Sequence, residues 1–157
     1  MTAYRVAPAF WKQFSKEWHR PILPAPRTPR PDLWPDRGLY AAWLGHATVL
    51  IKVDGITILD LSGRITLGEG SITLRDSVHD ALDKGSKNIL LNLAQISYID
   101  SSGVGELVSA FTSVKNAGGE LKLLNLTQKV HDLLQITKLY TVFDIWDNEA
   151  SAIGAFN

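Results

Sequence analysis

Apolar and polar positions follow a regular order from about residue 47 onwards, and this order predicts alternating strands and helices. Short apolar runs rich in β-branched residues predict strands at 47–53, 56–61, 88–93, 120–124 and 142–146. Between several of these runs, apolar residues recur at the three- and four-residue spacing of one helix face. Such helices are expected around 74–82, 104–114, 130–136 and 147–156. Strands that alternate with helices indicate parallel pairing through crossovers, and therefore an α/β fold.

One pair of predicted strands forms a hairpin. Asp54-Gly55 separates the runs 47–53 and 56–61, and this dipeptide is typical of two-residue turns because its residues tolerate a positive φ. These two strands are therefore expected to be antiparallel, whereas the later strands are parallel. The pattern predicts a mixed sheet.

The segment that joins the strand at 88–93 to the following helix carries the candidate site. Asp100, Ser101 and Ser102 are residue types that cap helix N-termini, since a side-chain oxygen can accept from the unpaired backbone N–H groups there. Gly103 and Gly105 leave the start of this helix bare, so another protein can reach a serine hydroxyl. We expect a strand, a short loop and then a helix whose N-terminus presents two serines.

Composition divides the chain into two parts. Residues 1–52 carry eight Lys or Arg against three Asp or Glu, and residues 53–157 carry eight against thirteen. All seven prolines lie at or before Pro35, and four of the five tryptophans lie at or before Trp43. We expect an irregular Pro/Trp-rich extension at 1–42 and a domain at 43–157, with its first strand at about 46–53. The extension is either a membrane-surface or partner-binding arm or, as we favour, a loosely packed or disordered tail.

Several classes of protein are disfavoured by composition. The chain has no cysteine, which excludes disulfides and thiolate metal sites. No apolar run approaches the roughly 20 residues that span a bilayer, and the start lacks the apolar core of a secretory signal. Nucleic-acid binding is not expected, because the basic excess lies in the irregular arm and the domain is acidic. We predict a cytoplasmic protein without membrane contact, as a monomer or weak dimer.

The serine segment resembles a known family. The run Asp-Ser-Ser-Gly-Val-Gly at 100–105 is similar to the signature of STAS domains, the anti-sigma factor antagonists of bacteria. Three further blocks match in family order, at 59–65, 116–121 and 139–144. The resemblance covers about 53–157 and implies a mixed β-sheet with helices packed on one side.

The resemblance also implies a function. In this family an anti-sigma factor with serine kinase activity phosphorylates the first serine after the aspartate, here Ser101. The unphosphorylated form binds the anti-sigma factor and frees the sigma factor, and phosphorylation ends the binding. Asp100 is expected to orient the loop or contact the partner, and Ser102 to act as a cap or a contact. The other residues expected at the partner-binding loop are Gly103, Gly105 and Glu106. The alternative is that both serines are ordinary N-caps.

Residues 1–60 resemble a second family. The stretch 43–59 is similar to an early hairpin of metallo-β-lactamase-fold hydrolases related to N-acylphosphatidylethanolamine phospholipase D. Those enzymes hold zinc with a His-x-His-x-Asp-His cluster, and catalytic zinc needs about three protein ligands. The four histidines, His19, His46, His79 and His131, lack this spacing. We therefore expect no metal, no cofactor and no catalytic residue, and we interpret the chain as a fusion joined within the hairpin at 53–60.

These observations favour a regulatory binding protein over an enzyme. The first hypothesis is an anti-sigma factor antagonist. The alternatives are a STAS binding module in another signalling or transport assembly, and a remnant of the metallo-hydrolase.

Overall fold

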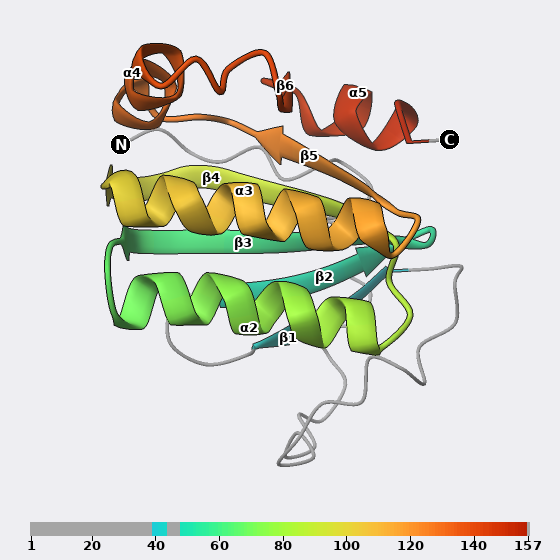
Figure 1. Cartoon of the computed structure of the whole chain (residues 1–157). Helices are drawn as coiled ribbons and strands as arrows, with labels where there is room; N and C mark the ends of the chain where they lie inside the picture. Colours follow the sequence, from blue (N-terminus) through green and yellow to red (C-terminus); the bar gives the residue numbers. More distant parts are fainter. Residues whose placement is uncertain (1–38, 44–47, 157) are drawn as a thin grey trace, which may run out of the picture.

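The computed structural model describes residues 39–43 and 48–156, which build one six-stranded sheet with helices against it (Figure 1). The strands are β1 (Leu39–Trp43), β2 (Thr48–Val53), β3 (Ile56–Ile65), β4 (Asn88–Ile99), β5 (Glu120–Leu124) and β6 (Asp144–Trp146). The helices are α2 (Glu69–Asp83), α3 (Ser101–Asn116), α4 (Gln128–Ile136) and α5 (Glu149–Gly154).

The strands lie in the sheet in the order in which they occur in the chain, from β1 to β6. The pairs β1–β2 and β2–β3 are antiparallel, and the strands from β3 to β6 pair in parallel. Asp54 and Gly55 have φ values of 48° and 84°, as a two-residue hairpin turn between β2 and β3 requires. The predicted mixed α/β sheet is confirmed.

The main core lies between the sheet and helices α2, α3 and α4. Its centre is formed by fully buried leucines from three strands and α3. Burial of one leucine side chain stabilises the fold by about 1.5–3 kcal/mol relative to exposure, so this layer fixes α3 against the sheet. The fully buried leucines at its centre are Leu59, Leu91, Leu107 and Leu123.

The opposite face of the sheet has a smaller core, which differs from the expectation that all helices pack on one side. Ile58, Leu90 and Leu124 point to this face, and Ala152 of α5 covers them. The reason is that central strands of a largely parallel sheet are apolar on both faces and need cover on both. The N-cap of α5 is Asn148, whose side chain accepts a hydrogen bond from the Ser151 N–H.

Strand β4 is longer than the apolar run that predicted it. It continues from Asn88 through Ile99, and its register against β3 shifts twice, between Asp60 and Ser62 and between Gly63 and Arg64. Such bulges let a strand continue while its side-chain alternation changes. As a result, β4 reaches the candidate site without the loop that we expected.

The sheet begins before the expected domain boundary. Strand β1 pairs with β2 from Leu39 to Trp43, so residues 39–42 form an edge strand and do not belong to an irregular segment. Residues 1–38, most of the proposed extension, lie outside the described residues, as does His46. For residues 1–38, the assignment to an irregular extension stays a prediction.

Candidate partner-binding site

The site begins where β4 meets α3, and Asp100 forms the junction. Its backbone is extended, with φ −111° and ψ −176°, and its side chain accepts a hydrogen bond from the Gly103 N–H at 2.9 Å. Its backbone carbonyl accepts from the Val104 N–H at 3.0 Å, and its own N–H donates to the Ile65 carbonyl at 3.3 Å. Asp100 is therefore the N-cap of α3 and is tied to the end of β3. The alternative that the two serines are the caps is wrong.

Ser101 and Ser102 are the first two residues of α3. Ser101 is exposed, whereas Ser102 is half-buried. The first backbone N–H groups of a helix have no partner within the helix, and the helix dipole adds a partial positive charge there. An anionic group on Ser101 would therefore lie at an end of α3 that favours negative charge.

The two glycines in the first turns of α3, Gly103 and Gly105, differ in their surroundings. Gly103 is buried, and a Cβ on it would lie 2.3 Å from the Ile65 carbonyl oxygen and 2.7 Å from Cγ1 of Ile99. Gly105 is exposed, and a Cβ built on it would meet no described atom within 4 Å beyond its chain neighbours and the nearby backbone of α3. Gly103 thus allows α3 to pack against β3. We expected both glycines to face outward, but only Gly105 does so.

Glu106 connects α3 to α2. Its carboxylate accepts two hydrogen bonds from Arg75, from Nη2 at 2.9 Å and from Nε at 3.2 Å. The side chain of Glu106 is 20% exposed and that of Arg75 is 47% exposed, so the pair lies at the rim of the two helices. Arg75 is not recognisable from the sequence as a partner of Glu106, because nothing local relates two residues that are 31 positions apart.

Two exposed apolar side chains lie near the start of α2. Leu67 is 82% exposed and Ile72 is 49% exposed. Ile65 contacts both Asp100 and Gly103, and Leu67 lies only two positions after Ile65 in the chain. The start of α2 and the N-terminus of α3 therefore lie at the same end of the sheet.

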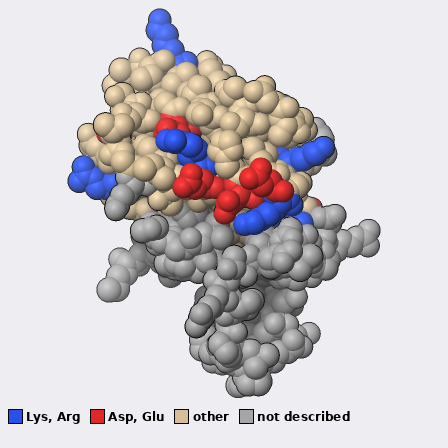
Figure 2. All heavy atoms as spheres, turned by 60° about the horizontal axis from the view of Figure 1, so that its bottom comes forward, with Lys and Arg blue, Asp and Glu red and all other residues tan. Residues whose placement is uncertain are grey.

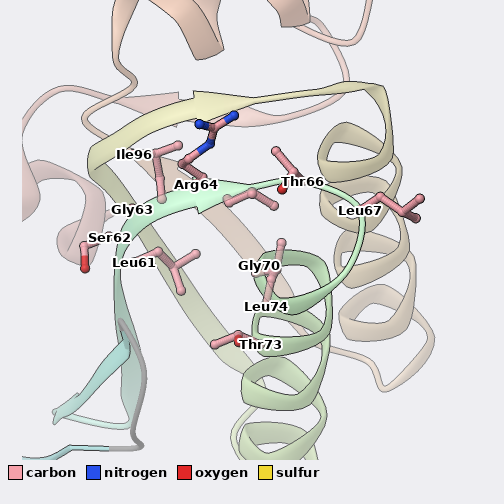
Figure 3. Close-up of a pocket in the computed structure, with 11 residues that line it drawn as sticks. Leu61, Ser62, Gly63, Arg64, Thr66, Leu67, Gly70, Thr73, Leu74 and Ile96 are labelled. Atoms are coloured by element: carbon pink, nitrogen blue, oxygen red, sulfur yellow. The ribbon is translucent and has the colours of Figure 1, made fainter.

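A pocket of about 570 Å³ opens between the end of β3 and the start of α2 (Figure 3). Gly70 allows α2 to begin close to β3, since a Cβ on it would lie 2.1 Å from the Arg64 carbonyl oxygen. The residues that line the pocket are Leu61, Ser62, Gly63, Arg64, Ile65, Thr66, Leu67, Gly70, Thr73, Leu74 and Ile96.

A group of polar residues lies on the face of the sheet that α5 covers. Asn92 Nδ2 donates to Asp60 Oδ1 at 2.7 Å, and Asn125 Nδ2 donates to Asn92 Oδ1 at 3.4 Å. Burial raises the pKa of the Asp60 carboxyl above its usual value, although the hydrogen bond from Asn92 acts in the opposite direction. Burial also raises the pKa of Glu149, and the charge of Asp60 adds to this effect.

Acidic and basic side chains are mixed on the face shown in Figure 2. Asp76, Asp80 and Asp83 are exposed acidic residues of α2. Within the described ranges, no group of three or more His, Cys, Asp or Glu side chains could hold a metal ion. Likewise, none of the helices described here is long and apolar enough to cross a membrane.

Most of the described chain matches one known domain family. The STAS domain model matches residues 47–152, which is more than half of the chain. The chain belongs to the STAS domain family. The match starts at residue 47, so it includes β2 as well as the region from about Val53 that the motifs covered.

Curated relatives and solved structures agree with this family. The anti-sigma F factor antagonist of Paenibacillus polymyxa is 29% identical over 100 residues, covering 63% of this chain and 85% of that protein. The anti-sigma-B factor antagonist of Bacillus subtilis is 33% identical over 87 residues, covering 55% and 78%. The NMR structure of the Thermotoga maritima protein TM1081 is similar with a TM-score of 0.63 at 27% identity, covering 73% of this chain and 91% of that one. The expected resemblance of residues 1–60 to metallo-hydrolases is not supported by these matches and stays a prediction.

Proposed function

We propose that this STAS domain is an anti-sigma factor antagonist that binds an anti-sigma factor with serine kinase activity through the first turn of α3. Phosphorylation of Ser101 ends the binding, and in this way the protein regulates sigma-factor-dependent transcription. The names of its curated relatives support the general role, since both are antagonists of an anti-sigma factor. The role is one of binding and not of catalysis.

The exposure of Ser101 is the observation that carries the proposal. Ser101 is an exposed residue at the start of α3, while Ser102 beside it is half-buried. The Asp100 carboxylate caps α3 by accepting a hydrogen bond from the Gly103 N–H, so the capping bond does not involve a serine hydroxyl. A kinase can therefore reach Ser101 without first opening the helix.

Phosphate at Ser101 would act as an electrostatic and steric switch. It adds about −1.5 to −2 charges and its own bulk to the exposed end of α3, next to the Asp100 carboxylate. The free N–H groups and the dipole of the helix partly offset this charge, so the fold tolerates it. Binding is lost because the contact surface changes, while the domain stays folded.

The test is to incubate the full chain with ATP and the anti-sigma factors that the relatives antagonise by name, anti-sigma F of P. polymyxa and anti-sigma-B of B. subtilis. Intact-mass measurement and peptide mapping then report the number and position of phosphates. We expect one phosphate on Ser101, absent in Ser101→Ala and retained in the matched control Ser102→Ala. Phosphate on Ser102 alone would contradict the assignment of the site, and binding without phosphate would favour a STAS module in another assembly.

A further inference from the structure

We propose that Gly105 marks the point where the partner's main chain comes closest to α3. This inference rests on the proposed function, because it names the contact within the same binding site. Gly103 and Gly105 of α3 differ in a way that only the packing reveals.

Glycine inside a helix needs a reason, because it weakens the helix by roughly 0.5–1 kcal/mol relative to alanine. For Gly103 the reason is internal, since a Cβ there would lie 2.3 Å from the carbonyl oxygen of Ile65. Gly70 of α2 has an internal reason of the same kind, since a Cβ there would lie 2.1 Å from the carbonyl oxygen of Arg64. Gly105 has none among the described residues, because a Cβ on it would have no atom within 4 Å apart from its chain neighbours and the nearby backbone of its own helix.

The backbone conformation does not require a glycine at 105 either. Gly105 is the fifth residue of a regular 16-residue helix, and its φ is not among the positive values of the chain. An alanine would therefore fit the fold and strengthen the helix. The space that the missing side chain leaves is open to the outside.

The position of Gly105 relative to Ser101 points to the occupant of that space. Residues four apart are neighbours on a helix surface, so Gly105 lies on the same face of α3 as Ser101, one turn further along the helix. The partner must place its own atoms against Ser101 to bind there and to transfer phosphate. An anti-sigma factor segment that follows the axis of α3 from Ser101 passes directly over Gly105.

Neighbouring side chains fit a protein surface at this end of the domain. Leu67 and Ile72, at 82% and 49% exposed, offer apolar contact on the side of α2. The Arg75–Glu106 pair forms a charged rim between the two helices. Exposed apolar anchors with a polar rim are typical of protein interfaces. The contact surface consists of Ser101 and Gly105 on α3 with Leu67 and Ile72 near the start of α2.

The experiment separates folding from binding by adding side chains at Gly105. Gly105→Ala and Gly105→Gln both introduce good helix formers of increasing size. Thermal unfolding of each full-chain variant is measured together with its affinity for the anti-sigma F and anti-sigma-B factors and for anti-sigma factors from the genome that encodes this chain. We expect an unfolding midpoint equal to or above that of the unsubstituted chain, with affinity at least tenfold lower for Gly105→Ala and lower still for Gly105→Gln. The rate of Ser101 phosphorylation should fall in the same order.

Gly154→Ala is the matched control. Gly154 is also exposed and open, but it ends α5 on the other face of the sheet, so its substitution should leave affinity unchanged. Equal binding by the unsubstituted chain and both Gly105 variants would overturn the inference and leave the proposed function standing. A lowered unfolding midpoint for Gly105→Ala would also overturn it, because the fold itself would then need the glycine. If no anti-sigma factor binds the unsubstituted chain, the proposed function fails, and the inference with it.

Discussion

The carboxylate of Asp100 accepts a hydrogen bond from the backbone N–H of Gly103 at 2.9 Å, and this contact sets the start of α3. It leaves Ser101 exposed on the first residue of the helix, with no capping task. Asp100 thus connects β4 to α3 and positions Ser101.

Loss of the Asp100 cap should destabilise the domain. For Asp100→Ala we expect the free energy of unfolding to fall by about 0.5–2 kcal/mol, because the Gly103 N–H loses its acceptor. Asp100→Asn should retain most of the stability, since its amide oxygen can accept the same bond. Urea denaturation measures both, with Ser101→Ala as a control that changes stability by less than about 0.5 kcal/mol. A loss for Ser101→Ala as large as for Asp100→Ala would contradict the assignment of the cap.

A side chain at Gly103 should disturb the packing of α3 on β3. In Gly103→Ala the Cβ would meet the Ile65 carbonyl oxygen at 2.3 Å and Cγ2 of Ile65 at 2.9 Å. We expect a loss of about 1–3 kcal/mol or more, the usual effect of overpacking a core. Thermal and urea unfolding would show it, and an unfolding midpoint unchanged from the parent chain would mean that α3 can shift without cost.

The Asp60 carboxylate should make stability depend on pH. Its pKa is raised in the folded state mainly by burial, so folding is favoured when the group is protonated. The free energy of unfolding should therefore rise as pH falls from neutral through the folded-state pKa, until the unfolded chain is also protonated. Asp60→Asn should be more stable than the parent chain at pH 7 and show a weaker pH dependence, because Asn92 can still donate to its side-chain oxygen. Denaturation at a series of pH values tests this, and a less stable Asp60→Asn at pH 7 would refute it.

Lys122 and Asp144 form an ion pair whose two partners should differ in their effect on stability. Lys122 is only 3% exposed, with its Nζ near Asp144 Oδ2, 3.4 Å from Glu120 Oε1 and 4.9 Å from the ring centre of Phe156. Asp144→Asn leaves a buried ammonium with a poorer partner and should cost about 1–3 kcal/mol. Lys122→Met should cost less, because Met fills the apolar site and the half-exposed Asp144 can be hydrated.

Urea denaturation at pH 7 compares the two variants, and a larger loss for Lys122→Met would contradict this account. Burial acts to raise the pKa of Asp144, but the hydrogen bond and charge of Lys122 outweigh it and lower the pKa. The contribution of the pair should therefore be present at neutral pH and lost only as pH falls below the usual range of an aspartate.

The pattern of the sequence located most elements because the signals are local. The Asp54-Gly55 turn and the helix face of Val104, Leu107 and Val114 depend only on neighbours within a few positions, and the structure has both. The end of β4 was missed for the same reason. Gln95 and Ser97 interrupt the apolar run that predicted the strand, and only pairing with β3 through two bulges keeps the strand continuous to Ile99.

The sequence by itself determined the order of strands β2 to β6, the order of the described helices and the segment that carries the serines, since periodicity, turn dipeptides and a motif are properties of adjacent residues. The tertiary structure decided that Asp100 and not a serine is the cap, that Gly103 is internal while Gly105 is open, and that Arg75 pairs with Glu106. It also decided that α5 covers the second face of the sheet. Each of these depends on which distant segments come within a few ångströms of each other, and that is set by packing of the whole chain.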